Sequence, residues 1–270
     1  MTNRADAVRS LLIGDIIGKP GRTAVRHALP ELRSELDIDL VVANGENVAA
    51  GMGLTPALAE ELLEMGIDVI TSGNHIWDKR EIYAYLEGDR PVLRPLNYPG
   101  DSPGRGWLVH HLPDGGEVAV INLMGRVYMN QLDSPFAAAD ALFDQAAEPL
   151  PPVRLVDFHC EITSEKNAMG WYLDGRVSAV VGTHTHVPTA DARVLPKGTA
   201  YISDLGMTGP RDSIIGFSVE TVLPRFLRHL PTRLEVGEGP VMLNAVVVEA
   251  DRTSGRANSI EQVQRLVEVD

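Results

Sequence analysis

The sequence predicts an α/β fold in a single globular domain, and three observations support these predictions. In the first half of the chain, short β-type runs alternate with amphipathic helical patterns, which is the rhythm of parallel βαβ units. The composition is that of an ordinary globular protein, with 44% hydrophobic and 23% charged residues. The 270 residues contain no repeat, low-complexity tract or linker, so we expect a single domain spanning residues 1–270.

The first half predicts three strands and two helices in alternation. We expect strands at residues 10–15, 39–44 and 67–72, and helices at residues 23–36 and 56–65. The second helix has the clearest boundaries, because Thr55 is a suitable N-cap, Pro56 suits the first helical position and Gly66 suits the end.

From about residue 90 the pattern changes to alternation between apolar and polar residues. An antiparallel hairpin is expected from residues 106–112 and 117–123, because Pro113-Asp114-Gly115-Gly116 between them has turn chemistry. The α/β alternation then resumes. We expect helices at residues 136–148 and 164–173, and strands at 153–159, 176–182, 193–196, 199–203, 241–250 and from 258 onward.

Charge, cysteine content and hydropathy exclude several classes of protein. The formal charge of −13 argues against broad binding to a nucleic-acid backbone. The apolar run at residues 241–250 is about half the length of a membrane helix, and the run at 11–13 has no cleavage-like site after it. The single cysteine, Cys160, excludes an internal disulfide framework and a Cys-rich zinc module. We therefore expect a cytoplasmic protein without a membrane segment, and the sequence leaves a homo-oligomer open.

Polar side chains follow five of the predicted strands at the point where each strand ends. In an open α/β sheet, this edge is where ligands bind. Carboxylates, carboxamides and imidazoles together suit Mn, Fe or Zn, and their number is sufficient for two ions. His184 and His186 are two residues apart, so both rings would face the same side of an extended segment. The polar stretches are Gly14-Asp15, Asn44-Gly45-Glu46-Asn47, Gly73-Asn74-His75, His159 and Gly182-Thr183-His184-Thr185-His186.

Taken singly, these residues have plainer interpretations. Asp15 alone would more often cap a turn, and Asn44-Gly45 alone looks like a turn. His159 alone would more often be a packed, hydrogen-bonded histidine, and Cys160 is better explained as a small buried residue than as a nucleophile. The prediction of a metal site depends on the whole set, because chance would not place ligand chemistry at five consecutive strand ends.

The order and spacing of these motifs resemble the calcineurin-like metallophosphoesterase superfamily. Its most specific signatures are matched by Gly73-Asn74-His75 and by the Gly-x-His-x-His stretch that ends at His186. The chain departs from the usual pattern twice, with Asp15-Ile16-Ile17 in place of Asp-x-His and Asn44-Gly45-Glu46-Asn47 in place of Gly-Asp-x-x-Asp. Both departures are similar to the YmdB-like bacterial branch, as are the opening at residues 14–22 and the segment Asp204-Leu205-Gly206-Met207-Thr208-Gly209-Pro210.

This resemblance implies a four-layer α/β/β/α sandwich, with mixed sheets flanked by helices and a two-metal centre at the sheet edge. One ion would be held by Asp15, His186 and, as a candidate, Asn47, and the other by Asn74, His159 and His184. Glu46 would bridge the two ions, in place of the aspartate usual in the superfamily. His75 would not bind metal but would lie beside the leaving-group oxygen.

The ligand set also indicates the metals and the chemistry. Three imidazoles are too soft for Mg²⁺ and the thiolates of structural zinc sites are missing, so we expect two divalent or trivalent ions per chain, with Fe or Mn favoured. Two ions roughly 3.5–4 Å apart can share a bridging hydroxide that attacks phosphorus in line with the leaving group. His75, if protonated, would donate to the departing alkoxide.

The residues themselves predict only a hydrolase of phosphate esters. The YmdB-like resemblance implies a phosphodiesterase of small nucleotides, with cyclic nucleotides (2′,3′ or 3′,5′) favoured. Two alternatives stay open: a phosphomonoesterase of small phosphate esters, and a catalytically silent interaction scaffold. Retention of His75 and the full ligand set favours the active enzyme. Lys19, Arg22 and Arg211 lie near glycine-rich loops, where surface charge is at least as good an explanation as substrate contact.

Overall fold

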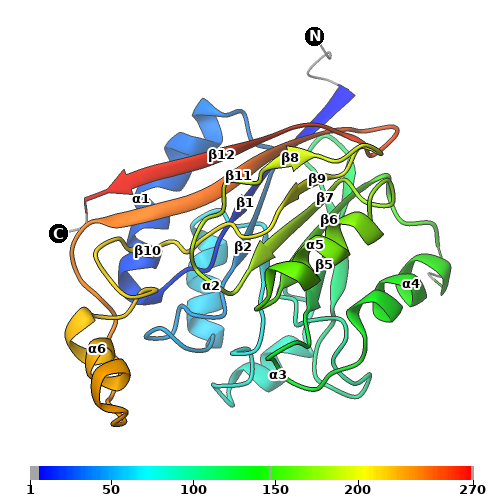
Figure 1. Ribbon diagram of the computed structural model, residues 1–270. Helices are drawn as coiled ribbons and strands as arrows, with labels where there is room; N and C mark the ends of the chain where they lie inside the picture. The colour runs from blue at the N-terminus through cyan, green and yellow to red at the C-terminus, as the bar shows by residue number, and fades with distance from the viewer. Residues whose placement is uncertain (1–5, 146–147, 269–270) are drawn as a thin grey trace.

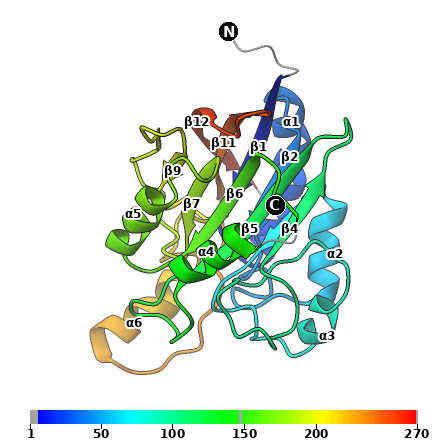
Figure 2. The ribbon, with the colours of Figure 1, turned by 90° about the vertical axis from the view of Figure 1, so that its right-hand side faces the viewer.

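The computed structural model describes residues 6–145 and 148–268 of the chain. Two mixed β-sheets pack face to face, and helices cover the outer face of each sheet (Figures 1 and 2). The predicted four-layer α/β/β/α sandwich is therefore confirmed. Across the described ranges, no helix combines the length and the apolar character that crossing a bilayer requires.

The first sheet combines parallel strands from the start of the chain with long antiparallel strands from its end. Its described strands are β1 (Ala7–Ile13), β2 (Leu40–Asn44), β3 (Val69–Thr71), β10 (Gly209–Pro210), β11 (Val241–Asp251) and β12 (Ala257–Val267). β1, β2 and β3 are parallel, and β11 pairs antiparallel with β1, β10 and β12. Helices α1 (Gly18–Glu35) and α2 (Pro56–Glu64) carry the chain between the parallel strands and cover the outer face.

The second sheet is parallel in its centre and antiparallel at both edges. Its described strands, in sequence order, are β4 (Trp107–His111), β5 (Glu117–Met124), β6 (Val153–His159), β7 (Ala179–Thr183), β8 (Arg193–Val194) and β9 (Ala200–Ile202). β5, β6, β7 and β9 are parallel, while β4 and β8 close the edges. Helices α4 (Pro135–Gln145) and α5 (Thr163–Tyr172) belong to the layer outside this sheet.

The alternation of side chains along β1 explains how two apolar layers form. Leu11 and Ile13 point to the helix side of the first sheet, whereas Val8 and Leu12 point to the second sheet. Because both faces of the strand are buried, five of its seven residues are apolar, and the strand ends in an apolar run at residues 11–13 instead of alternating. Packing of both faces fixes the position of each apolar run in the sheet. The polar residues that directly follow the run therefore lie at the edge of the sheet.

Most of the predicted elements are present, with shifted ends. The hairpin turn is confirmed, since the Leu112 amide donates to the Gly116 carbonyl at 2.7 Å. α2 is also confirmed, and the Thr55 side chain accepts from the Leu58 amide at 3.3 Å, a cap worth about 1 kcal/mol. α1 begins at Gly18 instead of residue 23. Pro20 lies in its first turn, where a proline is tolerated because the amides there lack intrahelical acceptors.

Other boundaries differ for local reasons. β7 begins at Ala179 rather than at residue 176, because Gly175 has a positive φ of 84° and the chain turns there. The helix expected at 136–148 ends at Gln145, and residues 146–147 lie outside the described residues.

Two further helices lacked a sequence prediction, α3 (Ile82–Leu86) and α6 (Val219–Arg228). α6 projects from the lower left of the molecule in Figures 1 and 2.

Candidate metal centre

The predicted site residues come from both sheets and meet at the carboxyl ends of the parallel strands. Asp15 follows β1, Glu46 and Asn47 follow β2, and Asn74 follows β3 in the first sheet. His159 ends β6, and His184 and His186 follow β7 in the second sheet. The face-to-face packing of the sheets therefore brings the two groups together.

Three oxygen and nitrogen atoms surround one ring nitrogen of His159. Its Nε2 atom lies 3.0 Å from Asn74 Oδ1, 3.0 Å from Glu46 Oε1 and 3.0 Å from His184 Nδ1. Glu46 Oε1 is buried without a hydrogen-bond partner among the described residues. One ring nitrogen carries at most one hydrogen and cannot satisfy three lone pairs, whereas a cation among these atoms would. The donor set thus fits a metal ion of the Fe, Mn or Zn type.

A second group of predicted ligands adjoins the first. Asp15 Oδ1 lies 3.7 Å from His186 Nε2, and Asn47 Nδ2 lies 3.4 Å from the same ring nitrogen. Asp15 is fully buried, and its Oδ1 atom has no hydrogen-bond partner among the described residues. Burial raises the pKa of Asp15. An orphaned carboxylate oxygen beside an imidazole is the arrangement that a second cation would satisfy.

The charges in the first group depend on one another. Burial raises the pKa of Glu46, but the interactions with His159 and His75 together outweigh it and lower that pKa to about 2. Burial likewise lowers the pKa of His159, but Glu46 and Asp15 outweigh it and raise that pKa to about 9. Burial and the charge of His159 lower the pKa of His184 to about 3. Without metal, His159 is therefore protonated, and its positive charge balances the carboxylates that a metal ion would otherwise balance.

A buried hydrogen-bond chain orients the His159 ring. His159 Nδ1 lies 2.9 Å from Thr183 Oγ1, and the Thr183 hydroxyl donates to Asp157 Oδ1 at 2.7 Å. The hydroxyl has a single hydrogen, so it accepts from His159 Nδ1–H, and the Nε2 lone pair of the neutral ring is left for the cluster. Burial raises the pKa of Asp157 to about 6. Sequence reasoning missed Asp157, although an acidic residue in the apolar β6 run is a visible signal.

The expectation that His184 and His186 lie in an extended segment is wrong. Both residues have positive φ, 99° for His184 and 67° for His186, a conformation that histidine adopts rarely and that is found at functional sites. The resulting turn sends the two rings apart, His184 towards His159 and His186 towards Asp15. One loop thus contributes an imidazole to each of the two groups.

The first position of the Gly-Asn-His motif must be glycine for a steric reason. A Cβ atom added to Gly73 would lie 2.1 Å from the His159 ring. Any other residue would therefore push His159 out of the cluster.

His75 lies next to the cluster but does not belong to its innermost set. Its Nδ1 atom lies 2.8 Å from Asp78 Oδ2, and its backbone amide donates to Glu46 Oε2 at 2.9 Å. The His75 side chain is 30% exposed, unlike the buried His159. This placement suits a group that meets a substrate from solvent. Asp78 was missed by the sequence prediction, which had no reason to pair it with His75.

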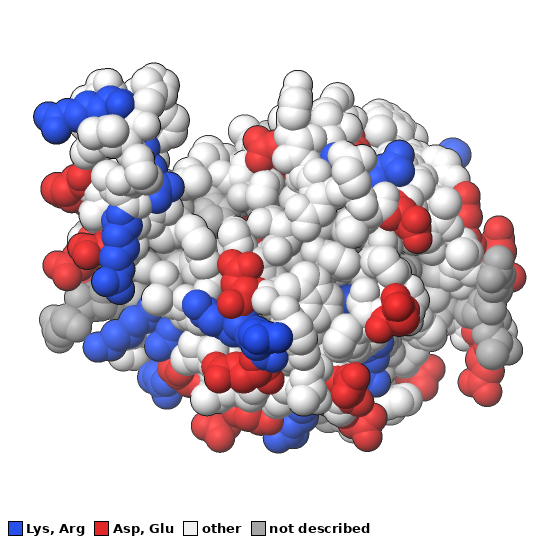
Figure 3. Space-filling model, turned by 90° about the horizontal axis from the view of Figure 1, so that it is seen from below, with Lys and Arg blue, Asp and Glu red and all other residues white. Residues whose placement is uncertain are grey.

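A cleft of about 450 Å³ opens over these residues and extends to the α6 region. Figure 3 shows the face into which it opens, with the projecting α6 segment at the upper left and a hollow beside it. Its lining includes Glu46, Asn47, His75, Glu161, His184 and His186. His184 Nε2 lies 3.0 Å from Glu161 Oε2, a partner that sequence reasoning missed. Lys19, Arg22 and Arg211 do not line the cleft, and Arg22 is bound to Glu61 and Arg211 to Asp212.

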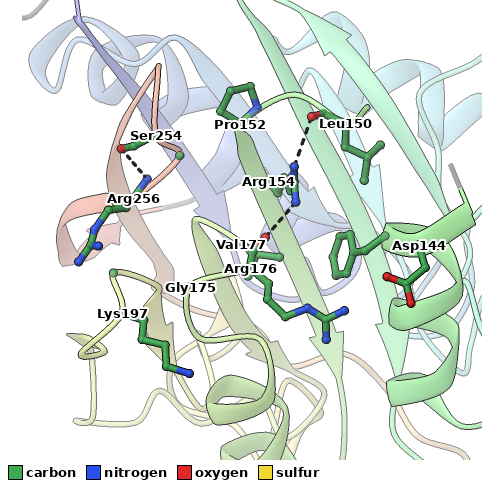
Figure 4. A pocket seen from close by; sticks show the side chains of 13 residues that line it. Asp144, Leu150, Pro152, Arg154, Gly175, Arg176, Val177, Lys197, Ser254 and Arg256 are labelled. Carbon is green, nitrogen blue, oxygen red and sulfur yellow. Dashed lines mark hydrogen bonds between the residues drawn. The ribbon is translucent and has the colours of Figure 1, made fainter. Parts of the chain in front are cut away.

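A second cleft, of about 380 Å³, lies at the opposite end of the same strands (Figure 4). Arg154 lines it five residues before His159 in β6, roughly 16 Å away at about 3.3 Å per residue. Its guanidinium donates to the Leu150 and Arg176 carbonyls, and Arg176 pairs with Asp140 at 2.8 Å. These cations fasten chain segments together, and the predicted site residues do not reach this cleft.

The chain and its fold have close counterparts among known proteins. The model of the YmdB-like protein family matches residues 11–263. A 2′,3′-cyclic-nucleotide 2′-phosphodiesterase of Bacillus subtilis (strain 168) is 48% identical over 256 residues, covering 95% of this chain and 96% of the relative. The crystal structure of a hypothetical protein from Thermus thermophilus is 45% identical, with a TM-score of 0.89 over 96% of this chain and 99% of that one. The crystal structure of a novel phosphatase from Mycoplasma pneumoniae is 34% identical, with a TM-score of 0.91 over 99% of this chain and 95% of that one. The chain therefore belongs to the YmdB-like family.

Proposed function

We propose that the chain hydrolyses phosphodiester bonds of small nucleotides, with 2′,3′-cyclic nucleotides as the favoured substrates, at a centre of two Fe or Mn ions. The relatives indicate a phosphoric-ester hydrolase. The observation that carries the proposal is the cluster around His159 Nε2, where three lone-pair atoms lie at 3.0 Å.

The ligand assignment follows the two groups at the strand ends. Asn74, His159 and His184 would hold one ion, and Asp15, Asn47 and His186 the other, with Glu46 between them. When bound, such ions act as Lewis acids towards a phosphoryl oxygen and lower the pKa of water. Asp15 and Glu46 contribute only two formal negative charges to the site, so loaded with divalent ions it attracts a phosphate ester despite the chain's charge of −13.

His75 would serve as the general acid. Its Nδ1–H faces Asp78, which orients the ring and leaves Nε2 to carry the transferable proton in the imidazolium form. Proton donation to a leaving alkoxide is typically worth about 10²–10⁴-fold in rate. The exposed edge of His75 in the cleft allows it to reach a substrate oxygen.

A substrate panel tests this proposal. The Mn²⁺-loaded protein is expected to hydrolyse a 2′,3′-cyclic nucleotide and a bis-aryl phosphate faster than the corresponding monoesters. Equal or greater turnover of the monoesters would favour a phosphomonoesterase. Two bound ions without hydrolysis of any phosphodiester would favour an interaction scaffold.

A further inference from the structure

The cleft has two chemically different walls. One wall is the polar set at the strand ends, described above. The other comes from Met52 and from the segment at residues 214–234, which includes α6, and it is apolar. The apolar lining residues are Met52, Ile214, Ile215, Phe217, Val222, Phe226 and Leu234. Single exposed apolar residues are ordinary, but seven that line one cleft beside a polar centre are typical of a small-molecule pocket.

Two side chains of this wall are available to a ligand. Phe226 is 70% exposed and Ile215 is 47% exposed, although both residues line the cleft. An exposed aromatic ring offers a flat surface for stacking.

The wall offers almost no hydrogen-bonding side chain. Arg225 is the only polar residue that the 214–234 segment contributes to the described lining of the cleft. Its guanidinium is already bound to Thr232, since Nε donates to Thr232 Oγ1 at 3.0 Å and Nη2 donates to the Thr232 carbonyl. A single, partly engaged guanidinium does not form a set of donors and acceptors that could distinguish the edges of the bases, so this wall offers a ligand mainly apolar contact.

The wall is fixed to the metal-ligand loop. His186 Nδ1 lies 2.9 Å from the Ile215 carbonyl, and Ile215 has a positive φ of 47°, which is rare for a β-branched residue. Phe217 is 7% exposed and packs on Gly51, where an added Cβ atom would lie 2.7 Å from its ring. The Ile215 carbonyl, which orients the His186 ring, thus belongs to the same short segment as the apolar wall. The hydrogen bond therefore fixes the distance between the apolar wall and His186.

We propose that the wall formed by Ile215 and Phe226 is a nucleobase subsite that holds the base by stacking and apolar contact without distinguishing one base from another. This inference rests on the proposed function and narrows it to cyclic nucleotides of any base. Base–aromatic stacking tolerates every base because each has a flat face, and its loss typically reduces binding roughly 5- to 150-fold.

A first experiment compares substrates on the Mn²⁺-loaded wild-type protein. The four 2′,3′-cyclic nucleotides are expected to have kcat/KM values within about fivefold of one another. The 2′,3′-cyclic phosphate of methyl riboside, which lacks a base, is expected to fall at least fivefold below all of them, mainly through a higher KM. A tenfold or larger preference for one base would overturn the proposal, as would equal use of the base-free ester.

A second experiment uses two neighbouring variants. Phe226→Ala is expected to lower kcat/KM at least fivefold more for the cyclic nucleotides than for the base-free ester. Leu227→Ala is the matched control, because Leu227 lies on the same helix, is 71% exposed and does not line the cleft. Both variants should keep wild-type metal content. Equal kinetics for the two variants would overturn the subsite while leaving the hydrolase intact, whereas wild-type protein inactive on every diester would overturn the proposed function and this inference with it.

Discussion

Lys166 and Asp204 form an ion pair with Nζ and Oδ2 2.6 Å apart, and their side chains are only 2% and 1% exposed. The same Asp204 oxygen accepts hydrogen bonds from the Thr185 amide at 3.2 Å and the Thr185 hydroxyl at 2.7 Å. Thr185 stands between His184 and His186, which both have positive φ. The ion pair therefore holds the histidine loop in a conformation that the loop would not keep by itself.

Removing the hydroxyl of Thr185 tests whether the Lys166–Asp204 pair acts as a clamp that holds the histidine loop. Thr185→Val keeps the shape of the side chain but loses the hydrogen bond to Asp204, so the histidine rings should lose orientation. We expect metal affinity to fall about 10- to 100-fold, the range typical of residues that orient ligands. Thr185→Ser is the matched control and should retain most of the affinity. A Mn²⁺ titration measures both, and wild-type affinity in Thr185→Val would show that the loop needs no clamp.

Breaking the ion pair should affect folding as well. Lys166→Met leaves the Asp204 carboxylate buried without its cation, which typically lowers the free energy of unfolding by about 3–5 kcal/mol. Urea unfolding of the metal-free proteins measures the change. Lys197→Met is a suitable control, because Lys197 is exposed and should change the free energy of unfolding by less than about 0.5 kcal/mol. Similar values for the two variants would contradict the role given to Lys166.

Metal binding should release protons. The metal-free His159 has a pKa of about 9 because Glu46 and Asp15 outweigh its burial, so it is protonated at pH 7. Glu46, with a pKa of about 2, is already ionised there, and His184, with a pKa of about 3, is already neutral. A cation must displace the His159 proton, so its apparent affinity should rise about tenfold per pH unit from pH 6 to pH 8.

Calorimetry in buffers of different ionisation enthalpy checks this expectation. At least one proton should leave per first Mn²⁺ bound at pH 7. Affinity that does not change with pH would show that His159 is neutral before the metal arrives.

Replacing His75 should separate proton donation from metal binding. His75→Ala should keep metal content close to wild type, because His75 is outside the cluster around His159, while turnover falls. The loss should be larger for a ribose alkoxide leaving group than for nitrophenolate, which needs little protonation. His184→Ala is the comparison and should lose metal and activity together. If His75→Ala also loses metal, or slows both substrates equally, His75 is not the general acid.

The sequence predicts the sheet edge well because the strands are buried on both faces. β6 has the predicted bounds, since its apolar run lies between Pro152 and His159. The residues that support the ligands could not be predicted in the same way. Lys166 and Asp204 are 38 positions apart, and no periodicity relates them. Their pairing depends on how α5 packs over the second sheet.

The α6 helix shows a different limit. Pro224 inside it is a helix-breaking signal, and the helix contributes only Val222 to the buried core. The apolar side chains of this helix recur at helical spacing, so the proline, and not a weak pattern, is what argues against a helix there. The sequence analysis therefore predicted no apolar wall for the site. It did predict that the seven polar residues at the strand ends lie close together.

The central claim is that the strand-end residues hold two ions that support hydrolysis, and one titration tests it most directly. Metal-free protein is titrated with Mn²⁺ while bound metal and hydrolysis of a 2′,3′-cyclic nucleotide are measured on the same samples. We expect hydrolysis to be negligible without metal and to reach its maximum as the second ion binds to each chain. Full activity at less than one ion per chain, or no activity with two ions bound, would contradict the account.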